Sequence, residues 1–179
     1  IIGLLGYFSF EKNKERNKIK LANKFNVATI KYNEDAKQIT INELIEIIKR
    51  NDVTYSPLAL YFLLDNDLIQ DKAKTNELFN ELINKTKLEK EIKNLIIYKK
   101  ALFNSNFVTE NDLLQILNPI INSESIWKSH ALYLLAEYFY ANRENQKAKE
   151  FFDKILVLPD GNNEIKLKSQ KRLNRDLSE

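Results

Sequence analysis

Few residues of this chain are of types that perform chemistry. His130 is the only histidine and cysteine is absent, which excludes disulfides, thiol chemistry and zinc sites built from several cysteines and histidines. A metal at His130 would need carboxylates alone beside it. Its place just before an apolar helical stripe favours a surface or partly buried structural histidine instead.

The segment LLDNDLIQD brings together three carboxylates, those of Asp65, Asp67 and Asp71. Carboxylate oxygens are the ligands that Ca²⁺ prefers, but the segment lacks the turn glycine and the terminal glutamate of an EF-hand. The end of one helix, followed by an N-cap at Asp71, explains these residues better. Phosphate-binding loops, nucleophile elbows and paired acid and base residues do not occur either. The sequence therefore predicts a protein that is not an enzyme, with no metal site and no cofactor.

The composition predicts a single all-α domain. The chain has 179 residues, of which 44% are hydrophobic, enough to form a real core. It contains only three glycines and three prolines, while helix-forming residues dominate. So few helix breakers in long runs of helix formers favour helices throughout.

The positive charge is concentrated near the N-terminus. Residues 11–24 carry six basic and two acidic side chains, so the rest of the chain is nearly neutral for a total of +3. Binding of nucleic acid, which requires a broad basic surface, is therefore not predicted. We interpret residues 11–24 as a basic helix beside a membrane, with Lys12, Lys14 and Arg16 close to the headgroups.

The first ten residues, IIGLLGYFSF, are almost entirely apolar. As a helix they would span roughly 15 Å, about half of a bilayer core. We interpret residues 1–10 as the C-terminal half of a transmembrane helix, in which Tyr7, Phe8 and Phe10 lie at the membrane interface. A buried first helix or the remnant of a signal peptide are the alternatives, although no cleavage site follows Phe10.

The segment from Ser125 to Gly161 predicts a helical hairpin. Apolar residues recur on one helical face before and after the polar turn ANRENQK, namely Leu132, Leu135, Ala136, Phe139, Ala148, Phe152 and Ile155. With Pro159 behind them, they resemble the tetratricopeptide pattern W-x₂-L-G-x₂-Y…A-x₃-F…P of about 34 residues. The short side chains of Ala136 and Ala148 suit two helices that cross closely.

This pattern recurs along the chain. Residues 56–83 align without gaps with residues 129–156, an offset of 73 residues or about two repeats. Spacings of 34, 38 and 35 residues separate the anchor positions of the second helices, which are Ile41, Thr75, Leu113 and Ala148. A last helix, EIKLKSQKRLNRDL, has the polar outer face of a terminal cap. We therefore expect residues 17–176 to form a tetratricopeptide-like α-solenoid of about four antiparallel hairpins with a C-terminal capping helix.

Local signals mark the expected helix starts. Capping boxes are predicted at Thr40 with Glu43, Thr86 with Glu89, and Thr109 with Asp112. Single N-caps are predicted at Ser56 before Pro57, at Asp71, and at Asn162 or Asn163. In the second helix of the first hairpin, the expected buried residues are Ile41, Ile45 and Ile48.

The chain combines an apolar N-terminal segment, a basic helix, four degenerate repeats and a final hairpin that opens with IWKSHALYLLAEYFYANRENQKAKEFFDKIL. This combination resembles the tetratricopeptide-like bacterial inner-membrane family that includes the ancillary subunit of the Sec translocon. The resemblance covers nearly the whole chain but rests on apolar spacings. It implies a single N-terminal span, a repeat domain on the periplasmic side, and protein partners among translocon or chaperone components.

We therefore expect a membrane-anchored scaffold that binds protein in a groove, with no small-molecule substrate. The candidate protein-binding residues are Tyr61, Trp127, Tyr133, Tyr138 and Tyr140. Core packing is the alternative for each of them. A soluble or lipid-anchored repeat protein of the cell envelope, acting in outer-membrane assembly or cell-division coordination, is the alternative function.

Overall fold

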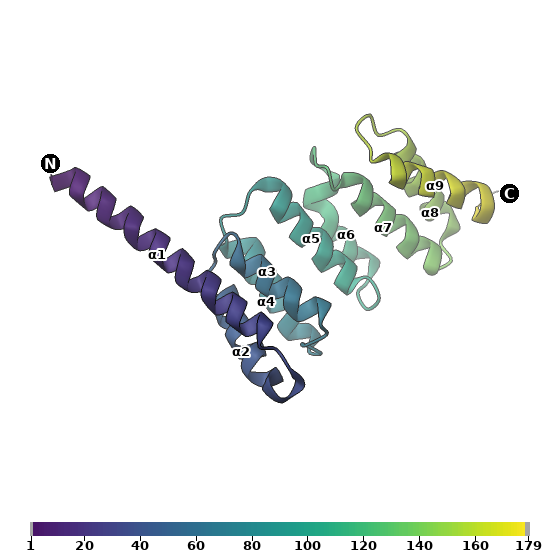
Figure 1. Ribbon diagram of the computed structural model, residues 1–179. Helices are drawn as coiled ribbons and strands as arrows, with labels where there is room; N and C mark the ends of the chain where they lie inside the picture. Colours follow the sequence, from purple (N-terminus) through teal and green to yellow (C-terminus); the bar gives the residue numbers. More distant parts are fainter. Residues whose placement is uncertain (1, 178–179) are drawn as a thin grey trace. The chain divides into compact units, whose positions relative to one another are not determined.

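The described part of the protein consists of helices joined by short turns. The structure, a computed structural model, describes the backbone of residues 2–177 and the side chains of residues 11–33 and 35–177. This range contains no strand, a short 3-10 helix at Glu34–Ala36, and nine α-helices, which are α1 (Ile2–Ile30), α2 (Lys37–Ile48), α3 (Tyr55–Asp65), α4 (Lys72–Lys85), α5 (Lys90–Asn104), α6 (Glu110–Ile121), α7 (Lys128–Ala141), α8 (Asn145–Leu156) and α9 (Asn163–Asp176). The expected all-α class is confirmed, and the packing of consecutive helices within residues 1–87 and within residues 88–179 is consistent with an α-solenoid (Figure 1).

The chain divides into two compact units, Ile1–Lys87 and Leu88–Glu179. In the first unit, α1 packs against α2 and α3, while α4 contacts α2 and α3. In the second unit, α5 pairs with α6, α7 pairs with α8, and α9 packs on both α7 and α8. The largest fully buried side chains include Leu44, Ile47, Leu60, Leu63, Phe79 and Leu82 in the first unit and Leu113, Leu117, Phe139 and Phe152 in the second.

Helix α1 continues without a break through the basic segment. The sequence predicts a basic juxtamembrane helix at residues 11–24, and in the structure these residues lie within one helix from Ile2 to Ile30. Residues 11–20 are all exposed, whereas Ala28 is buried. Only the second half of α1 therefore belongs to the packed part of its unit, and the first half extends past the other helices of that unit (Figure 1).

Two ring contacts align the packed half of α1 with α3. Phe25 lies 5.9 Å from Tyr55, and Tyr32, just after the end of α1, lies 5.9 Å from Phe62. Both pairs are separated by the same number of residues, so the two chain segments run side by side in the same direction. The α2–α3 turn therefore lies beside α1 near Lys24, where the projecting half of α1 begins.

The predicted transmembrane segment, residues 1–10, lies outside the residues whose side chains are described. The same holds for the predicted interfacial residues Tyr7, Phe8 and Phe10. Among the described residues, no helix combines the length and the apolar character that a membrane span requires.

The register predicted for α2 is wrong by one residue. Ile41 and Ile45 are only half-buried, although Ile48 is buried as expected. The buried stripe starts one position earlier, at Thr40, Leu44 and Ile47. Isoleucines on both sides of this helix make its apolar period ambiguous, and Ile39 remains 65% exposed.

The internal repeat is confirmed in the positions of the helices. Helix α3 begins at Tyr55 and α7 at Lys128, while α4 begins at Lys72 and α8 at Asn145. Both pairs of starts are 73 residues apart, as the ungapped alignment predicts. Equivalent positions in the two hairpins are also equally buried, including Leu63 with Ala136, Thr75 with Ala148, Phe79 with Phe152, and Leu82 with Ile155.

Three of the predicted helix caps are confirmed. Asp71 accepts hydrogen bonds from the backbone N–H groups of Ala73 and Lys74 at the start of α4. Thr109 and Asp112 form a reciprocal capping box on α6. The side chain of Asn162 accepts from the N–H of Ile165, so it is the N-cap of α9 rather than Asn163. These contacts satisfy N–H groups that a helix start leaves without a partner.

The other predicted caps are wrong, because the helices begin elsewhere. Thr40 lies inside α2, whose N-cap is Ala36. Thr86 ends α4, and α5 begins after Glu89. Ser56 lies inside α3 and donates to the carbonyl of Ile47, while the carboxylate of Asp52 accepts from the N–H groups of Thr54 and Tyr55. A threonine followed by glutamate three residues later was thus an unreliable signal in this chain.

Candidate functional site

Four of the five predicted protein-binding residues lie on α7 or at its start. Trp127 is the N-cap of α7, and Tyr133, Tyr138 and Tyr140 lie within the helix. All four side chains are half-buried. Because α7 contacts α5 and α6 as well as α8 and α9, its half-buried residues connect the hairpins of the second unit. We call these residues, with the adjoining Leu134 and Glu137, the α7 face.

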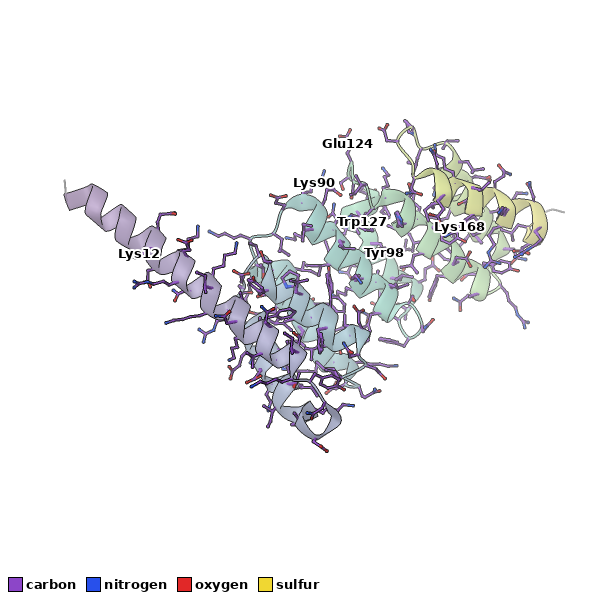
Figure 2. All side chains as sticks on the ribbon, in the orientation of Figure 1. Lys12, Lys90, Tyr98, Glu124, Trp127 and Lys168 are labelled. Carbon is purple, nitrogen blue, oxygen red and sulfur yellow. The ribbon has the colours of Figure 1, made fainter. Side chains whose placement is uncertain are left out.

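Trp127 joins α7 to α5. Its indole N–H donates to the carbonyl oxygen of Glu91 at 3.1 Å, and its ring stacks on Tyr98 with 5.9 Å between ring centres (Figure 2). The hydroxyl of Ser125 donates to the carboxylate of Glu91 at 2.8 Å and accepts from the backbone N–H of Trp127. These contacts favour a packing role for Trp127, since its polar atom is already satisfied within the protein.

His130 lies against this aromatic pair. The centre of its ring is 5.2 Å from that of Trp127 and 5.9 Å from that of Tyr98. Burial lowers the pKa of the His130 imidazole below its ordinary value, while the carboxylate of Glu164 in α9 opposes that shift. Among the described residues, no three His, Cys, Asp or Glu side chains are arranged to hold a metal ion. The arrangement is that of a packed aromatic cluster.

Tyr138 lies at the wall of a hollow beside α7. Its hydroxyl donates to the carbonyl oxygen of Val108 at 3.1 Å, which links α7 to the turn between α5 and α6. The hollow has a volume of about 410 Å³, and Leu134 and Glu137 line it together with Tyr138. It combines an aliphatic, an anionic and an aromatic group within one helix face.

Tyr133 and Tyr140 lie on the side of α7 that meets α8 and α9. The Tyr133 ring contacts the edge of Phe152 at 5.5 Å between ring centres. The guanidinium of Arg172 lies 5.0 Å from the centre of the Tyr140 ring. Arg172 also donates twice to the carboxylate of Glu137, at 2.8 and 2.7 Å. Tyr140 therefore contacts the terminal helix through Arg172, whereas Tyr133 packs against α8.

Tyr61, the fifth predicted residue, lies on α3 in the first unit. Its side chain is half-buried, and burial raises its pKa to about 12, with a further contribution from the carboxylate of Asp65. Tyr61 is therefore a packed tyrosine of a different unit. The other four predicted residues share α7 but contact different neighbours, whereas Tyr61 lies in the other unit.

The predicted membrane-proximal cations are exposed. Lys12, Lys14 and Arg16 lie on the projecting half of α1 (Lys12 is labelled in Figure 2). Beside them is a concave corner of about 860 Å³, formed by one side of α1 and by the end of α2 with the turn that follows. We call it the basic corner, since its cationic lining residues are Lys14, Lys18, Lys20, Lys24 and Arg50.

Several residues of these surfaces were not predicted from the sequence. Tyr98, Leu134, Glu137 and Arg172 belong to the α7 face or contact it, and Arg50 belongs to the basic corner. The apolar repeat pattern identifies buried positions, so it carries no signal for half-exposed residues beside them. Arg50 could have been found, because the predicted hairpin places the end of its second helix beside the first.

Two surfaces of the described residues are hollowed, one lined by aliphatic and aromatic side chains of α7 and the other by exposed cations of α1. Comparisons of the chain with protein families, with curated proteins and with solved structures found no match.

Proposed function

We propose that the chain is a membrane-attached scaffold of tetratricopeptide-like hairpins that holds another protein beside the bacterial inner membrane, by binding and not by catalysis. One observation carries the proposal. The apolar sequence of residues 2–10, the exposed basic residues 11–20 and the packed residues around Ala28 all lie on one continuous helix. A membrane segment at its start would therefore be joined to the first unit by helix rather than by a flexible linker.

The α7 face supports the binding part of this proposal. Leu134 and Tyr138, which line its hollow, offer an apolar contact and an aromatic ring within about one turn of helix, and Glu137 beside them is held by Arg172. Surfaces of this kind accept a helix or an extended segment of another protein. The resemblance in apolar spacings implies the periplasm as location and translocon or chaperone components as partners.

The alternative function is that of an envelope repeat protein that is soluble or held by a lipid, acting in outer-membrane assembly or cell-division coordination. Any residues encoded before Ile1 would distinguish the two. About ten further apolar residues would complete a membrane span. A lipid-accepting cysteine would instead favour the alternative.

Photo-crosslinking in cells tests the binding part directly. A photoreactive phenylalanine analogue replaces Leu134, which lines the hollow, and in a control it replaces Glu150, an exposed residue of α8. We expect the Leu134 position to capture a protein of the membrane or the periplasm and the Glu150 position not to do so. Capture of soluble cytosolic proteins alone, or the same products at both positions, would contradict the proposal.

A further inference from the structure

Four of the five cations of the basic corner form no ion pair among the described residues, although the Glu46 carboxylate that pairs with Lys24 also interacts electrostatically with Arg50. Lys24 pairs with Glu46 at 2.6 Å. The carboxylate of Asp52 accepts from two backbone N–H groups at the start of α3, at 2.9 and 2.8 Å. The other four cations, Lys14, Lys18, Lys20 and Arg50, are exposed and form no ion pair with any residue that the structure describes. The corner therefore offers an excess of positive charge to an anion from outside.

The cations come from two separate parts of the chain. Lys14, Lys18 and Lys20 lie on α1, whereas Arg50 follows the end of α2. Because α2 runs antiparallel to α1 and Glu46 pairs with Lys24, Arg50 lies about one turn further along, near Lys20. The projecting half of α1 forms the wall of the corner, and the α2–α3 turn forms its floor. Packing of the hairpin, and not sequence proximity, brings these charges together.

The distribution of charge around α1 identifies the kind of anion. The corner involves only one side of the helix. Lys12 and Arg16 point elsewhere, because successive residues are turned by about 100° around the axis. An acidic peptide in the corner would leave these two cations without a partner. A layer of anionic headgroups around the helix reaches cations on every side of it.

The distances along α1 fit the same partner. Lys14 follows Phe10 by about 6 Å of helix and Lys20 by about 15 Å. The headgroup region adds roughly 5–8 Å beyond the hydrocarbon core, and charges beyond it interact over a Debye length of about 8 Å. If the membrane ends near Phe10, Lys14 lies among the headgroups, and Lys18 and Lys20 lie within reach of their field. The floor, with Arg50, lies within reach of their field.

We propose that the basic corner binds the anionic phospholipid headgroups of the bilayer, and that Arg50 on the α2–α3 turn draws the first unit toward the membrane surface. This proposal extends the proposed function, since the membrane segment brings the corner to the bilayer. The turn next to α2 thereby acts as a second membrane contact, which limits how far the unit swings away from the surface.

Vesicle flotation of the whole chain tests the proposal with two kinds of vesicle. Vesicles of phosphatidylcholine alone report on insertion of the apolar segment. The additional binding when part of that lipid is replaced by phosphatidylglycerol reports on the corner. We compare the unmodified protein with Arg50→Gln and with a triple variant in which Lys14, Lys18 and Arg50 become Gln. A matched control changes three cations of the second unit to Gln, all of them exposed or half-exposed. These are Lys90, Lys128 and Lys171.

Each cation near an anionic surface contributes roughly fivefold to binding, less with distance. We expect Arg50→Gln to lower the phosphatidylglycerol-dependent binding about twofold and the triple variant about tenfold or more. The control should change it little, and no variant should alter binding to phosphatidylcholine alone. Circular dichroism verifies that each variant is folded. We expect the variants to fold, because the substituted side chains are exposed or half-exposed.

Three results would overturn the proposal. The first is an Arg50→Gln variant that binds anionic vesicles like the unmodified protein. The second is a control that loses as much binding as the triple variant. The third is release from the vesicles by an acidic peptide or by inorganic phosphate at unchanged ionic strength, which would identify a different anion as the ligand. Failure of the proposed membrane segment would appear separately, as absence of binding to phosphatidylcholine vesicles.

Discussion

Arg172 of α9 and Glu137 of α7 are joined by two parallel hydrogen bonds, from Nε to Oε1 at 2.8 Å and from Nη2 to Oε2 at 2.7 Å. A third guanidinium nitrogen of Arg172 donates to Asp176 at 2.8 Å. Both side chains of the Arg172–Glu137 pair are only 27% exposed. Two-point pairing of this kind fixes geometry as well as charge, so it sets how the terminal helix lies on the last hairpin.

Replacement of Arg172 should loosen the terminal helix. Arg172→Met retains much of the apolar stem but removes both bonds to Glu137, so the free energy of unfolding should fall by about 1 kcal/mol. Urea denaturation measures this change. Lys171→Met, at an exposed neighbouring position, serves as the control and should have little effect. Equal stability of the two variants would show that the pair does not hold α9.

The contribution of Asp176 to the stability of the fold should depend on pH. Arg175 and Arg172 lower the pKa of Asp176 well below its ordinary value of 3.8. A lowered pKa in the folded state means that Asp176 stabilises the fold above about pH 4, and that this contribution is lost as the pH falls further. Asp176→Asn should therefore be less stable than the unmodified protein at pH 7, and the two should converge toward pH 2. Thermal melts at both pH values measure the difference, and a gap that is independent of pH would contradict this assignment.

The close pairing of α7 and α8 should not accept a larger side chain. Ala136 and Ala148 are both fully buried in this hairpin. Ala148→Leu adds volume to a packed interior and should lower the free energy of unfolding by about 1–3 kcal/mol. Gln146→Leu, at an exposed position of the same helix, is the matched control. If both variants unfold at the temperature of the unmodified protein, Ala148 does not lie at a close crossing.

The single tryptophan provides a probe of His130. The two rings lie 5.2 Å apart, so protonation of the imidazole should quench the fluorescence of Trp127. Because burial lowers the pKa of His130, the transition should lie below the ordinary value of 6.5, even though Glu164 opposes the shift. His130→Gln should abolish it. A transition at or above pH 6.5 would show that Glu164 outweighs burial.

The same shift has a consequence for stability. The unfolded chain binds a proton at His130 more readily than the folded chain does, so stability should fall as the pH decreases through the region below 6.5. Above that pH the imidazole is neutral in both states and contributes no pH dependence. The His130→Gln variant should lack this part of the pH dependence in chemical denaturation.

Much of the fold could be predicted because equivalent positions of the internal repeat are buried to the same degree. The 73-residue offset predicts the starts of α7 and α8 from those of α3 and α4, since equivalent positions of the two hairpins are equally buried. The register of α2 could not be derived, because isoleucines lie on both sides of that helix. Two of the three predicted capping boxes were wrong, since local signals at Thr40 and Thr86 are weaker than the packing that decides where helices start.

The candidate surfaces could be predicted only in part. Aromatic residues of α7 were identified because they follow one another in a single segment, and the cations of α1 because they are concentrated in the sequence. The partners that define each surface come from other helices, as Arg172 does for Tyr140 and Arg50 for Lys20. Such contacts depend on how hairpins pack, which the apolar period alone does not encode.

The central claim is that this chain is attached to a membrane by the segment that begins α1. Alkaline carbonate extraction of membranes from bacterial cells that produce the protein tests it most directly, because this treatment removes proteins held by charge and retains those with an inserted segment. The account predicts that the unmodified protein stays with the membranes and that Leu4→Asp with Leu5→Asp, which places two charges in the apolar segment, releases it. Release of the unmodified protein into the supernatant would contradict the account.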